Sequence, residues 1–442
     1  MSAAAATGSD TIRVGHTEHL RGTISVPGDK SIAHRALMLG ALAHGWTRVV
    51  GLPRNADVGA TIDALAACGV LIQRNAEAAI VQGCGFESLR PNGADIDCAN
   101  SGTTMRLLTG IIAGADCAPV VLTGDASLSR RPMRRVAEPL AKMGAEILLS
   151  EQGTPPIRIT PKRLRGADHD LKVPSAQVKT ALIFAGLFAE GTTRIGGAIV
   201  SRDHTERMLP VFGVRIETET TKTGEALVVP GGQKLEGAFV RVPGDPSSAA
   251  FWIAAGLIVN NADIVLRGIG ANPSRFAFID IVRRMGANIE VDFERMVPEP
   301  VATLRIRSSQ LNAAVIEASE VASAIDELPL LAILATQARG TTVVHNAREL
   351  RVKESDRIES VASMLRALGG EIETFDDGFA IDGPQQLHGG RIESHDDHRI
   401  AMAGSVAALV AKGECEIAGA SSASVSYPAF FSTLAQLGGK VA

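Results

Sequence analysis

The sequence predicts a mixed α/β fold of two domains, each built from three copies of a β-α-β-α-β-β unit. Two local patterns, each present six times along the chain, and a set of helices that are apolar on nearly every side lead to this prediction. Each unit would be about 70 to 80 residues long, which is longer than the usual solenoid repeat.

The first pattern begins with a short polar or glycine-containing stretch and continues as an apolar helical run, a turn residue and a β-branched strand. Polar and turn residues just before an apolar-periodic run mark a helix start, and β-branched residues favour the following strand. The six copies span residues 26–51, 97–122, 173–197, 242–268, 325–344 and 394–419. The pattern therefore predicts six helices that each follow one strand and lead into another.

The second pattern follows each copy of the first and is a helix that ends in glycine before a further strand. A glycine just beyond an apolar-periodic helix adopts the positive φ that turns the chain into the next element. The six glycines are Gly69, Gly144, Gly213, Gly286, Gly369 and Gly438. Together the two patterns give each unit the order β-α-β-α-β-β.

The helices of the first pattern indicate how the six units assemble. They are apolar nearly all round in residues 36–42, 181–188, 249–258, 330–335 and 401–410. A helix without a polar face must be buried on all sides, which an open solenoid does not provide. We therefore favour two compact domains of three units each, with these helices in the interior.

Composition excludes several classes of function. The 442 residues carry a formal net charge of −4, which argues against a nucleic-acid or anionic-membrane surface. The five cysteines are scattered without a C-x-x-C pair, as expected of reduced thiols in the cytoplasm. The start of the chain lacks the features of a secretory leader, and apolar runs such as residues 400–411 are too short to span a membrane. We expect a soluble, unprocessed cytoplasmic protein.

Basic side chains nevertheless gather where predicted strands lead into helices. They are Lys30, Arg35, Arg106, Arg130, Arg131, Arg202, Lys353, Arg357 and Arg399. Helix N-termini offer free N–H groups and a positive dipole end, so cations beside them suit phosphate and carboxylate groups. Any one of these residues could simply be solvated, but their recurrence at equivalent places favours a small polyanionic ligand. Residues 27–31 lack the G-x-x-x-x-G-K-[ST] spacing of a Walker loop, which argues against nucleotide binding of that type.

Three acidic residues accompany these cations. Asp326 and Glu327 stand at the predicted start of the fifth buried helix, and Glu354 lies between Lys353 and Arg357. A carboxylate at a helix start among cations keeps a low pKa and is commonly an ion-pair partner. The functional alternative is that it moves a proton at the bound substrate.

The sequence His-Asp-Asp-His at residues 395–398 raises the alternative of a metal site. No third ligand group follows at a recognisable spacing, so this alternative is weak. We prefer helix capping by the two aspartates, with Arg399 facing the ligand. Neither a metal nor a cofactor is expected.

Five segments resemble the EPSP synthase family of enolpyruvyl transferases, within a likeness that runs from Arg21 to the C-terminus. These segments are residues 27–35, 100–106, 124–132, 351–357 and 397–402. The resemblance implies two domains of three units in an inside-out α/β barrel, in agreement with the repeat count. It also implies that residues 24–242 are inserted between residues 1–23 and 243–442, with the active site in the cleft between the domains.

The same resemblance implies two substrates and the residues that bind them. Shikimate 3-phosphate would contact Lys30, Ser31, Arg35, Ser175, Ala176, Gln177, Arg202, Asp326 and Lys353. Phosphoenolpyruvate would contact Lys30, Gly102, Arg131, Gln177, Arg357 and Arg399. Asp326 would take the proton of the shikimate 5-hydroxyl, while Glu354, with Lys30, protonates the enolpyruvyl methylene. Addition followed by loss of phosphate would give 5-enolpyruvylshikimate 3-phosphate in the shikimate pathway, on a monomeric enzyme.

Residues 425–428 depart from the family pattern, and Gly102 bears on inhibition by glyphosate. Some members have a Lys before Thr-Phe-Pro that contacts phosphoenolpyruvate, whereas this chain has Val425 to Pro428, so that contact is absent or replaced. Glyphosate is an expected inhibitor, and strongly tolerant members carry Ala where this chain has Gly102. A side chain at that position would crowd the ligand.

Two other functions remain as alternatives. A sister enzyme transfers enolpyruvate to UDP-N-acetylglucosamine, but it has a Cys where this chain has Ala126, and Cys117 lies outside that loop. A non-catalytic repeat protein that binds anions would explain the architecture but not the placement of Asp326 and Glu354.

Overall fold

The chain folds into two compact units, which we call unit 1 and unit 2. The computed structural model describes residues 10–75, 78–91, 95–221 and 224–442. Unit 1 comprises the described part of residues 1–26 together with Pro246–Glu294 and Ala302–Ala442. Unit 2 comprises the described parts of Pro27–Asp245 together with Arg295–Val301.

Each unit contains three four-stranded sheets that share one strand order. The unit 2 sheets are β14 (Phe239–Arg241), β3 (His44–Val50), β5 (Ala78–Cys84) and β4 (Leu71–Arg74); β6 (Ile96–Asp97), β7 (Val120–Thr123), β9 (Ile157–Thr160) and β8 (Glu146–Leu148); and β10 (Asp168–Leu171), β11 (Thr192–Gly197), β13 (Gly224–Pro230) and β12 (Glu217–Thr221). The unit 1 sheets are β16 (Asn288–Arg295), β17 (Val301–Arg307), β15 (Asp263–Gly270) and β2 (Arg21–Ile24); β18 (Val315–Ile316), β19 (Gly340–Val344), β21 (Gly378–Gly383) and β20 (Glu373–Phe375); and β22 (Arg391–Glu393), β23 (Glu414–Ala418), β1 (Thr11–Gly15) and β24 (Lys440–Val441).

The strand pairing follows the predicted repeat. In the third sheet of unit 2, β10 runs parallel to β11 with Asp168 opposite Arg194, while β13 is antiparallel to both β11 and β12. A parallel pair requires a crossover, which the first helix of each repeat supplies, and an antiparallel pair allows a hairpin. The predicted order β-α-β-α-β-β is confirmed.

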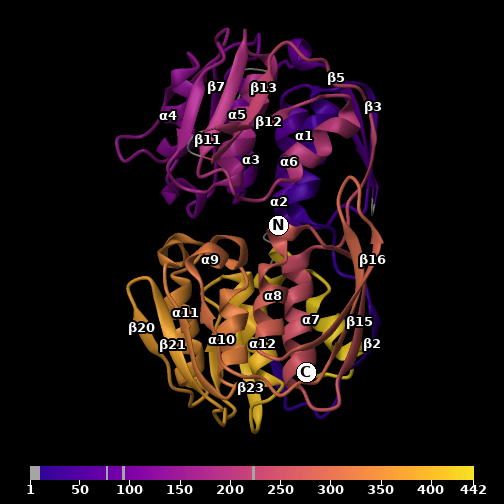
Figure 1. Ribbon diagram of the computed structural model, residues 1–442, viewed down its shortest axis with the longest axis vertical. Coiled ribbons are helices and arrows are strands. Elements are labelled where there is room, and N and C mark those ends of the chain that lie inside the picture. The colour runs from indigo at the N-terminus through magenta and orange to yellow at the C-terminus, as the bar shows by residue number, and fades with distance from the viewer. Residues whose placement is uncertain (1–9, 76–77, 92–94, 222–223) are drawn as a thin grey trace, which may run out of the picture. The chain divides into compact units, whose positions relative to one another are not determined.

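The first helix of each repeat lies in the interior of its unit. These helices are α1 (Lys30–Leu42), α3 (Gly102–Ile112) and α5 (Ala176–Phe188) in unit 2, and α7 (Pro246–Ile258), α10 (Leu328–Ala335) and α12 (His398–Ala408) in unit 1. Most of their residues are buried, and α7, α10 and α12 pack against one another (Figure 1). The prediction of buried, all-round apolar helices is confirmed.

The second helix of each repeat ends in the predicted glycine. These helices are α2 (Ala56–Ala67), α4 (Arg134–Lys142), α6 (His204–Met208) with η3 (Leu209–Phe212), α8 (Ala277–Arg284), α11 (Arg357–Ala367) and α13 (Phe430–Gln436). All six glycines have positive φ, between 75° at Gly369 and 103° at Gly438. A β-carbon would be strained in this conformation, so the sequence pattern and the backbone agree.

Strands from distant parts of the chain complete three of the sheets. β2 pairs in parallel with β15 in unit 1, and β14 pairs in parallel with β3 in unit 2. β1 lies between β23 and β24 and closes the last sheet. The remaining short elements are α9 (Ala318–Ala324), η1 (Phe86–Ser88), η2 (Leu128–Arg130), η4 (Pro273–Arg275), η5 (Arg348–Val352) and η6 (Ala420–Val425).

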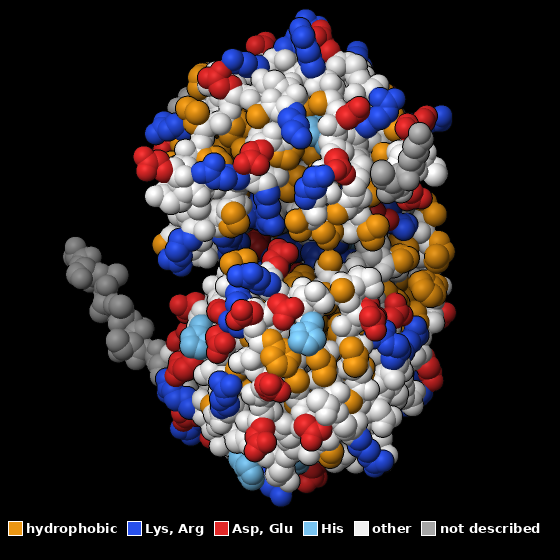
Figure 2. All heavy atoms as spheres, turned by 60° about the vertical axis from the view of Figure 1, so that its left-hand side comes forward, with side chains coloured by type: hydrophobic (Ala, Val, Ile, Leu, Met, Phe, Trp, Pro, Cys, Tyr) orange, Lys and Arg blue, Asp and Glu red, His pale blue; other side chains and the backbone are white. Residues whose placement is uncertain are grey.

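Each unit has its own hydrophobic core, centred on the interior helices. In unit 1 the core includes Trp252, which stacks on Phe430 and meets the edge of Tyr427. Among the described residues, no helix is both long and apolar enough to cross a membrane. On the face drawn in Figure 2, Lys and Arg side chains are interspersed with Asp and Glu on each unit.

Candidate active site

In unit 2 most of the predicted ligand-binding residues stand at the starts of the three interior helices, whereas Arg131 follows η2 and Arg202 precedes α6. Polar side chains cap these starts, because the first N–H groups of a helix have no partner within it. Asp29 accepts a hydrogen bond from the Ile32 N–H in α1, and Ser175 accepts one from the Val178 N–H in α5. Ser101 caps α3 in the same way, directly before Gly102.

Lys30, at the first position of α1, is held by a carboxylate that the sequence analysis did not single out. Its Nζ lies 2.6 Å from Asp57 Oδ2 in the first turn of α2. The two residues are separated by 27 positions, so only the packing of α1 on α2 brings them together. A lysine ammonium beside a helix N-terminus suits an anion.

Ser31, Arg35 and Arg202 form one connected group. Arg202 Nη1 lies 3.4 Å from Ser31 Oγ, and Arg35 donates to the Ser31 carbonyl oxygen at 2.9 Å. Arg35 also donates to Thr205 Oγ1 at 2.8 Å and to Thr180 Oγ1 at 2.9 Å. Burial lowers the pKa of Arg35 to about 10, an effect that Glu206 opposes and Arg202 reinforces.

Arg35 is more deeply buried than Arg202, the other cation of this group. Its side chain is buried and its guanidinium donates to protein oxygens on α1, α5 and α6. Its expected contact with shikimate 3-phosphate therefore stays a prediction, and the geometry indicates that it also holds the helix starts together.

A second group connects α3, α5 and the segment after β7. Gln177 accepts a hydrogen bond from Arg106 Nη1 at 2.6 Å and donates to Thr103 Oγ1 at 2.9 Å. Arg131 Nη2 donates to Asn100 Oδ1 at 2.7 Å. A β-carbon at Gly102 would lie 2.9 Å from Arg106 Nη1 and 3.3 Å from Arg131 Nη1. Gly102 therefore leaves room for two guanidinium groups at the start of α3.

In unit 1 the predicted residues converge on one carboxylate, Asp326. Its Oδ1 lies 3.3 Å from Arg357 Nη1 and 3.7 Å from Lys353 Nζ, and its Oδ2 lies 3.7 Å from Arg399 Nη2. Arg399 also donates to the Asp326 carbonyl oxygen at 2.9 Å. Three cations therefore surround one half-buried carboxylate, an arrangement that suits the binding of anionic ligands beside it.

Arg357 lies at the centre of this cluster and is fully buried. Its Nε and Nη2 donate to the two oxygens of Asp397 at 2.8 and 3.2 Å, and Nη2 donates to Glu354 Oε2 at 2.6 Å. Burial alone would lower the pKa of Arg357, but Asp397 and Glu354 raise it above its ordinary value. The guanidinium is therefore permanently charged.

Asp397 has the capping role predicted for the segment at residues 395–398. It accepts the Arg399 N–H at 2.9 Å at the start of α12, while it binds the Arg357 side chain. Although burial opposes ionisation, Arg357 and His398 hold the pKa of Asp397 below its usual value. His395 and Asp396 have positive φ and precede the helix.

Glu327 differs from the expected low pKa of a carboxylate at a helix start among cations. Burial raises the pKa of Glu327, an effect that Arg399 opposes and Asp326 reinforces. It accepts a hydrogen bond from Ser247, whose hydroxyl also accepts one from Arg275 at 2.7 Å. The low-pKa expectation was wrong here, because desolvation in the interior outweighs the nearby cations.

The segment from Val425 to Pro428 contains no cationic side chain and packs against the core of unit 1 through Tyr427. Val425 ends η6, and Tyr427 is buried against Trp252 and Phe430. Val425 itself carries no charge, so a replacement for the lysine contact expected from the resemblance stays a prediction.

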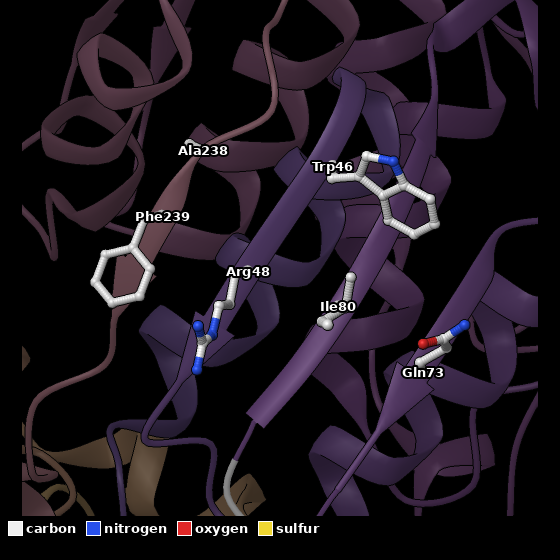
Figure 3. Close-up of a pocket in the computed structure, with 6 residues that line it drawn as sticks. All are labelled: Trp46, Arg48, Gln73, Ile80, Ala238 and Phe239. Atoms are coloured by element: carbon white, nitrogen blue, oxygen red, sulfur yellow. The ribbon is translucent and has the colours of Figure 1, made fainter.

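A groove on the sheet surface of unit 2 lies apart from the predicted residues. Figure 3 shows its lining side chains on β3, β4, β5 and β14 and on the residue before β14; they are Trp46, Arg48, Gln73, Ile80, Ala238 and Phe239. None of them was predicted as a site residue. Within each unit, the helix starts with their capping side chains and paired cations are therefore the stronger candidate.

Comparison with known proteins shows the family of this chain. The family model described as EPSP synthase (3-phosphoshikimate 1-carboxyvinyltransferase) matches residues 14–434. The 3-phosphoshikimate 1-carboxyvinyltransferase of Halorhodospira halophila is 50% identical over 422 residues, which cover 95% of this chain and 94% of the relative. A solved EPSP synthase from Acinetobacter baumannii is 39% identical with a TM-score of 0.87, and the match covers 98% of this chain and 99% of that chain.

A more distant structure shares the fold alone. The enolpyruvyl transferase NikO from Streptomyces tendae is 17% identical with a TM-score of 0.77, over 98% of this chain and 99% of that chain. The two-domain α/β fold is therefore common to enolpyruvyl transferases with little sequence in common. Two findings are more specific than the fold: the family model matches residues 14–434, and one relative is 50% identical over 422 residues. The chain therefore belongs to the EPSP synthase (3-phosphoshikimate 1-carboxyvinyltransferase) family.

Proposed function

We propose that this member of the EPSP synthase family transfers the enolpyruvyl group of phosphoenolpyruvate to the 5-hydroxyl of shikimate 3-phosphate and releases phosphate. The observation that carries the proposal is the cluster around Asp326, whose oxygens lie within 3.7 Å of Lys353, Arg357 and Arg399. A carboxylate that can accept a proton stands there among cations that suit two anionic substrates. Family membership favours this reaction over transfer to UDP-N-acetylglucosamine and over a non-catalytic role.

We propose that each of the two substrates is bound by its own set of residues, with some residues shared. Shikimate 3-phosphate would be held by Lys30, Ser31, Arg35, Ser175, Ala176, Gln177, Arg202, Asp326 and Lys353. Phosphoenolpyruvate would be held by Lys30, Gly102, Arg131, Gln177, Arg357 and Arg399. Planar guanidinium groups bind carboxylate and phosphate with two parallel hydrogen bonds, which a lysine ammonium does not reproduce.

The proposed mechanism is an addition followed by an elimination. Asp326 takes the proton of the shikimate 5-hydroxyl as that oxygen attacks C2 of phosphoenolpyruvate, and Glu354, with Lys30, delivers a proton to C3. The tetrahedral adduct then returns a proton from its methyl group to Glu354 as the C2–O bond to phosphate breaks, which restores the double bond and releases phosphate. The surrounding cations stabilise the charge that develops, as preorganised electrostatic catalysis.

The proposal requires residues of both units to act on the same ligands. Lys30, Gln177 and Arg131 belong to unit 2, whereas Asp326 and Glu354 belong to unit 1. We propose a cleft between the units that closes when the first substrate binds, because closure excludes water and completes the site. We also propose that the enzyme acts as a monomer in the cytoplasm.

An assay of phosphate release tests this function directly. The purified chain with phosphoenolpyruvate and shikimate 3-phosphate is expected to release one phosphate for each enolpyruvyl ether formed. Mixtures with UDP-N-acetylglucosamine in place of shikimate 3-phosphate are expected to release none. Turnover with UDP-N-acetylglucosamine alone would support the sister reaction, and the absence of turnover with either acceptor would contradict a catalytic role.

Substitution of Gly102 by alanine tests the proposed phosphoenolpyruvate site. The new β-carbon crowds Arg106 and Arg131, so the glyphosate concentration for half inhibition is expected to rise about tenfold, which corresponds to about 1.4 kcal/mol of overpacking. Inhibition is measured at fixed phosphoenolpyruvate concentration. Gly59→Ala is the matched control, because a β-carbon at Gly59 in α2 meets nothing within 4 Å. Equal inhibition of both variants would contradict the crowding argument.

A further inference from the structure

One buried lysine of unit 2 lies outside the machinery described above. Lys179 stands in α5, two residues beyond Gln177, and its side chain is only 3% exposed. Its Nζ lies 2.6 Å from Glu206 Oε1, 3.1 Å from the Ile199 carbonyl oxygen and 3.4 Å from the Ser201 carbonyl oxygen. An ammonium has three N–H donors, so these acceptors satisfy it completely.

The acceptors of Lys179 belong to one short stretch of chain. Residues 198–203 lie between β11 and α6 and are neither helical nor extended. Ile199 and Ser201 lie in this stretch, and Glu206 lies in the first turns of α6. Outside helices and sheets, backbone carbonyl groups need other partners, which Lys179 provides for two of them.

The stretch held in this way carries Arg202. Arg202 Nη1 lies 3.4 Å from Ser31 Oγ, at the start of α1. The adjacent segment is anchored as well, since His204 Nδ1 lies 2.8 Å from Glu299 Oε1 and the Thr205 hydroxyl accepts from Arg35. Lys179 links the carbonyl groups of Ile199 and Ser201 to the interior helix α5. Val200, which lies between them, is 85% exposed.

Stability alone does not explain a buried lysine here. Removing an ammonium from water is costly, and well-packed apolar residues often replace buried ion pairs without loss of stability. Glu206 also has a second charged neighbour, because its carboxylate raises the pKa of Arg35 against the effect of burial. Among the described residues, Glu206 Oε2 has no hydrogen-bond partner. The feature of Lys179 that an ion pair with Glu206 does not explain is therefore its contact with the carbonyl groups of Ile199 and Ser201.

We propose that Lys179 is a positioning residue for shikimate 3-phosphate, which acts by fixing the 198–203 stretch and with it the guanidinium of Arg202. The inference rests on the proposed role of Arg202 in binding that substrate. Guanidinium groups bind phosphate in a defined geometry, and displacement of a positioning group by about 1 Å can cost up to about a hundredfold in rate. Lys179 itself makes no contact with the substrate in this proposal.

The test is the steady-state kinetics of Lys179→Met, which keeps an unbranched side chain of nearly the same length and removes its charge. The KM for shikimate 3-phosphate is expected to rise about tenfold, while kcat and the KM for phosphoenolpyruvate stay within about twofold. Lys162→Met is the matched control, because Lys162 is an exposed lysine of the same unit that pairs with Glu146. Its kinetic constants are expected to equal those of the wild type.

A double variant separates positioning from stability. Lys179→Met alone leaves Glu206 without its cation, whereas Lys179→Met with Glu206→Gln removes both charges but still leaves the two carbonyl groups without the lysine donor. Within the described part of the chain, the Ile199 carbonyl then keeps only its hydrogen bond from the Ser201 hydroxyl at 3.2 Å. Thermal unfolding is expected to recover in the double variant, and the KM for shikimate 3-phosphate is expected to remain raised. If Lys179→Met does not fold, the double variant alone is compared with the wild type.

Three results would overturn the inference. They are an unchanged KM for shikimate 3-phosphate in the folded variants, a KM that returns to the wild-type value in the double variant, and an equal rise in the KM for phosphoenolpyruvate. Arg202→Ala distinguishes this failure from failure of the proposed site. An unchanged KM for shikimate 3-phosphate in Arg202→Ala contradicts the assigned role of Arg202, whereas a raised KM there with normal Lys179→Met kinetics contradicts the role of Lys179 alone.

Discussion

Replacement of Asp326 by alanine is expected to lower kcat by about a thousandfold, the middle of the range for loss of a general base. Asp326 is a carboxylate with three cations at 3.3 to 3.7 Å, and none of these can take the proton of an attacking hydroxyl in its charged form. The addition step would therefore lose its proton acceptor. Asp326→Asn is expected to behave similarly, since it keeps the shape but not the basicity.

Rates of phosphate release and substrate affinity must be measured separately for these variants. The dissociation constant of shikimate 3-phosphate is expected to change far less than kcat, because loss of transition-state stabilisation leaves most ground-state contacts in place. Glu359→Gln is a suitable control, since Glu359 is a carboxylate of the same unit that pairs with Arg351. A kcat near the wild-type value in Asp326→Ala would remove Asp326 from the mechanism.

Substitution of Asp397 by asparagine is expected to lower the free energy of unfolding of unit 1 by about 3 kcal/mol. Asp397 and Arg357 are both almost fully buried and share two hydrogen bonds, so the variant leaves a buried guanidinium short of negative charge. Glu354 and Asp326 still face Arg357, which places the loss at the low end of the range for a broken buried pair. The KM for phosphoenolpyruvate is expected to rise as well.

The two tryptophans allow this loss to be assigned to one unit. Trp252 is buried in unit 1 and Trp46 is exposed in unit 2, so a Trp46→Phe background makes urea unfolding of unit 1 visible by fluorescence alone. Asp396→Asn is the matched control: Asp396 is exposed, and asparagine tolerates its positive φ of 57°. Equal stability of the two asparagine variants would contradict the proposed role of the buried pair.

The buried pair of Asp397 and Arg357 also predicts how the stability of unit 1 changes at acid pH. The pKa of Asp397 is lower in the folded protein than its ordinary value of about 3.9, so its ionised form stabilises the fold above that pH. The stabilisation is lost as the pH falls from there through the folded-state pKa. Asp397→Asn is expected to lack this part of the pH dependence, which urea titrations at several acid pH values would measure.

Local sequence patterns were sufficient for the architecture and for most of the candidate site. Each repeat follows from short-range chemistry: a capped start, an apolar helix, and a glycine with positive φ such as Gly69 or Gly438. The resemblance named cations that do converge within each unit, for example Lys353, Arg357 and Arg399 around Asp326. These features depend on neighbours in the chain or on motifs, so they can be recognised without coordinates.

Partners that are distant in sequence could not be recognised in this way. The pairing of Lys30 with Asp57, the raised pKa of Glu327 and the contacts of Lys179 with the 198–203 stretch all depend on which helices pack together. Burial and charge pairing are properties of a three-dimensional environment, and the linear sequence does not contain the distances on which they depend. The repeats and the type of chemistry are therefore visible in the residues themselves, whereas the ionisation and positioning of the site follow from tertiary packing.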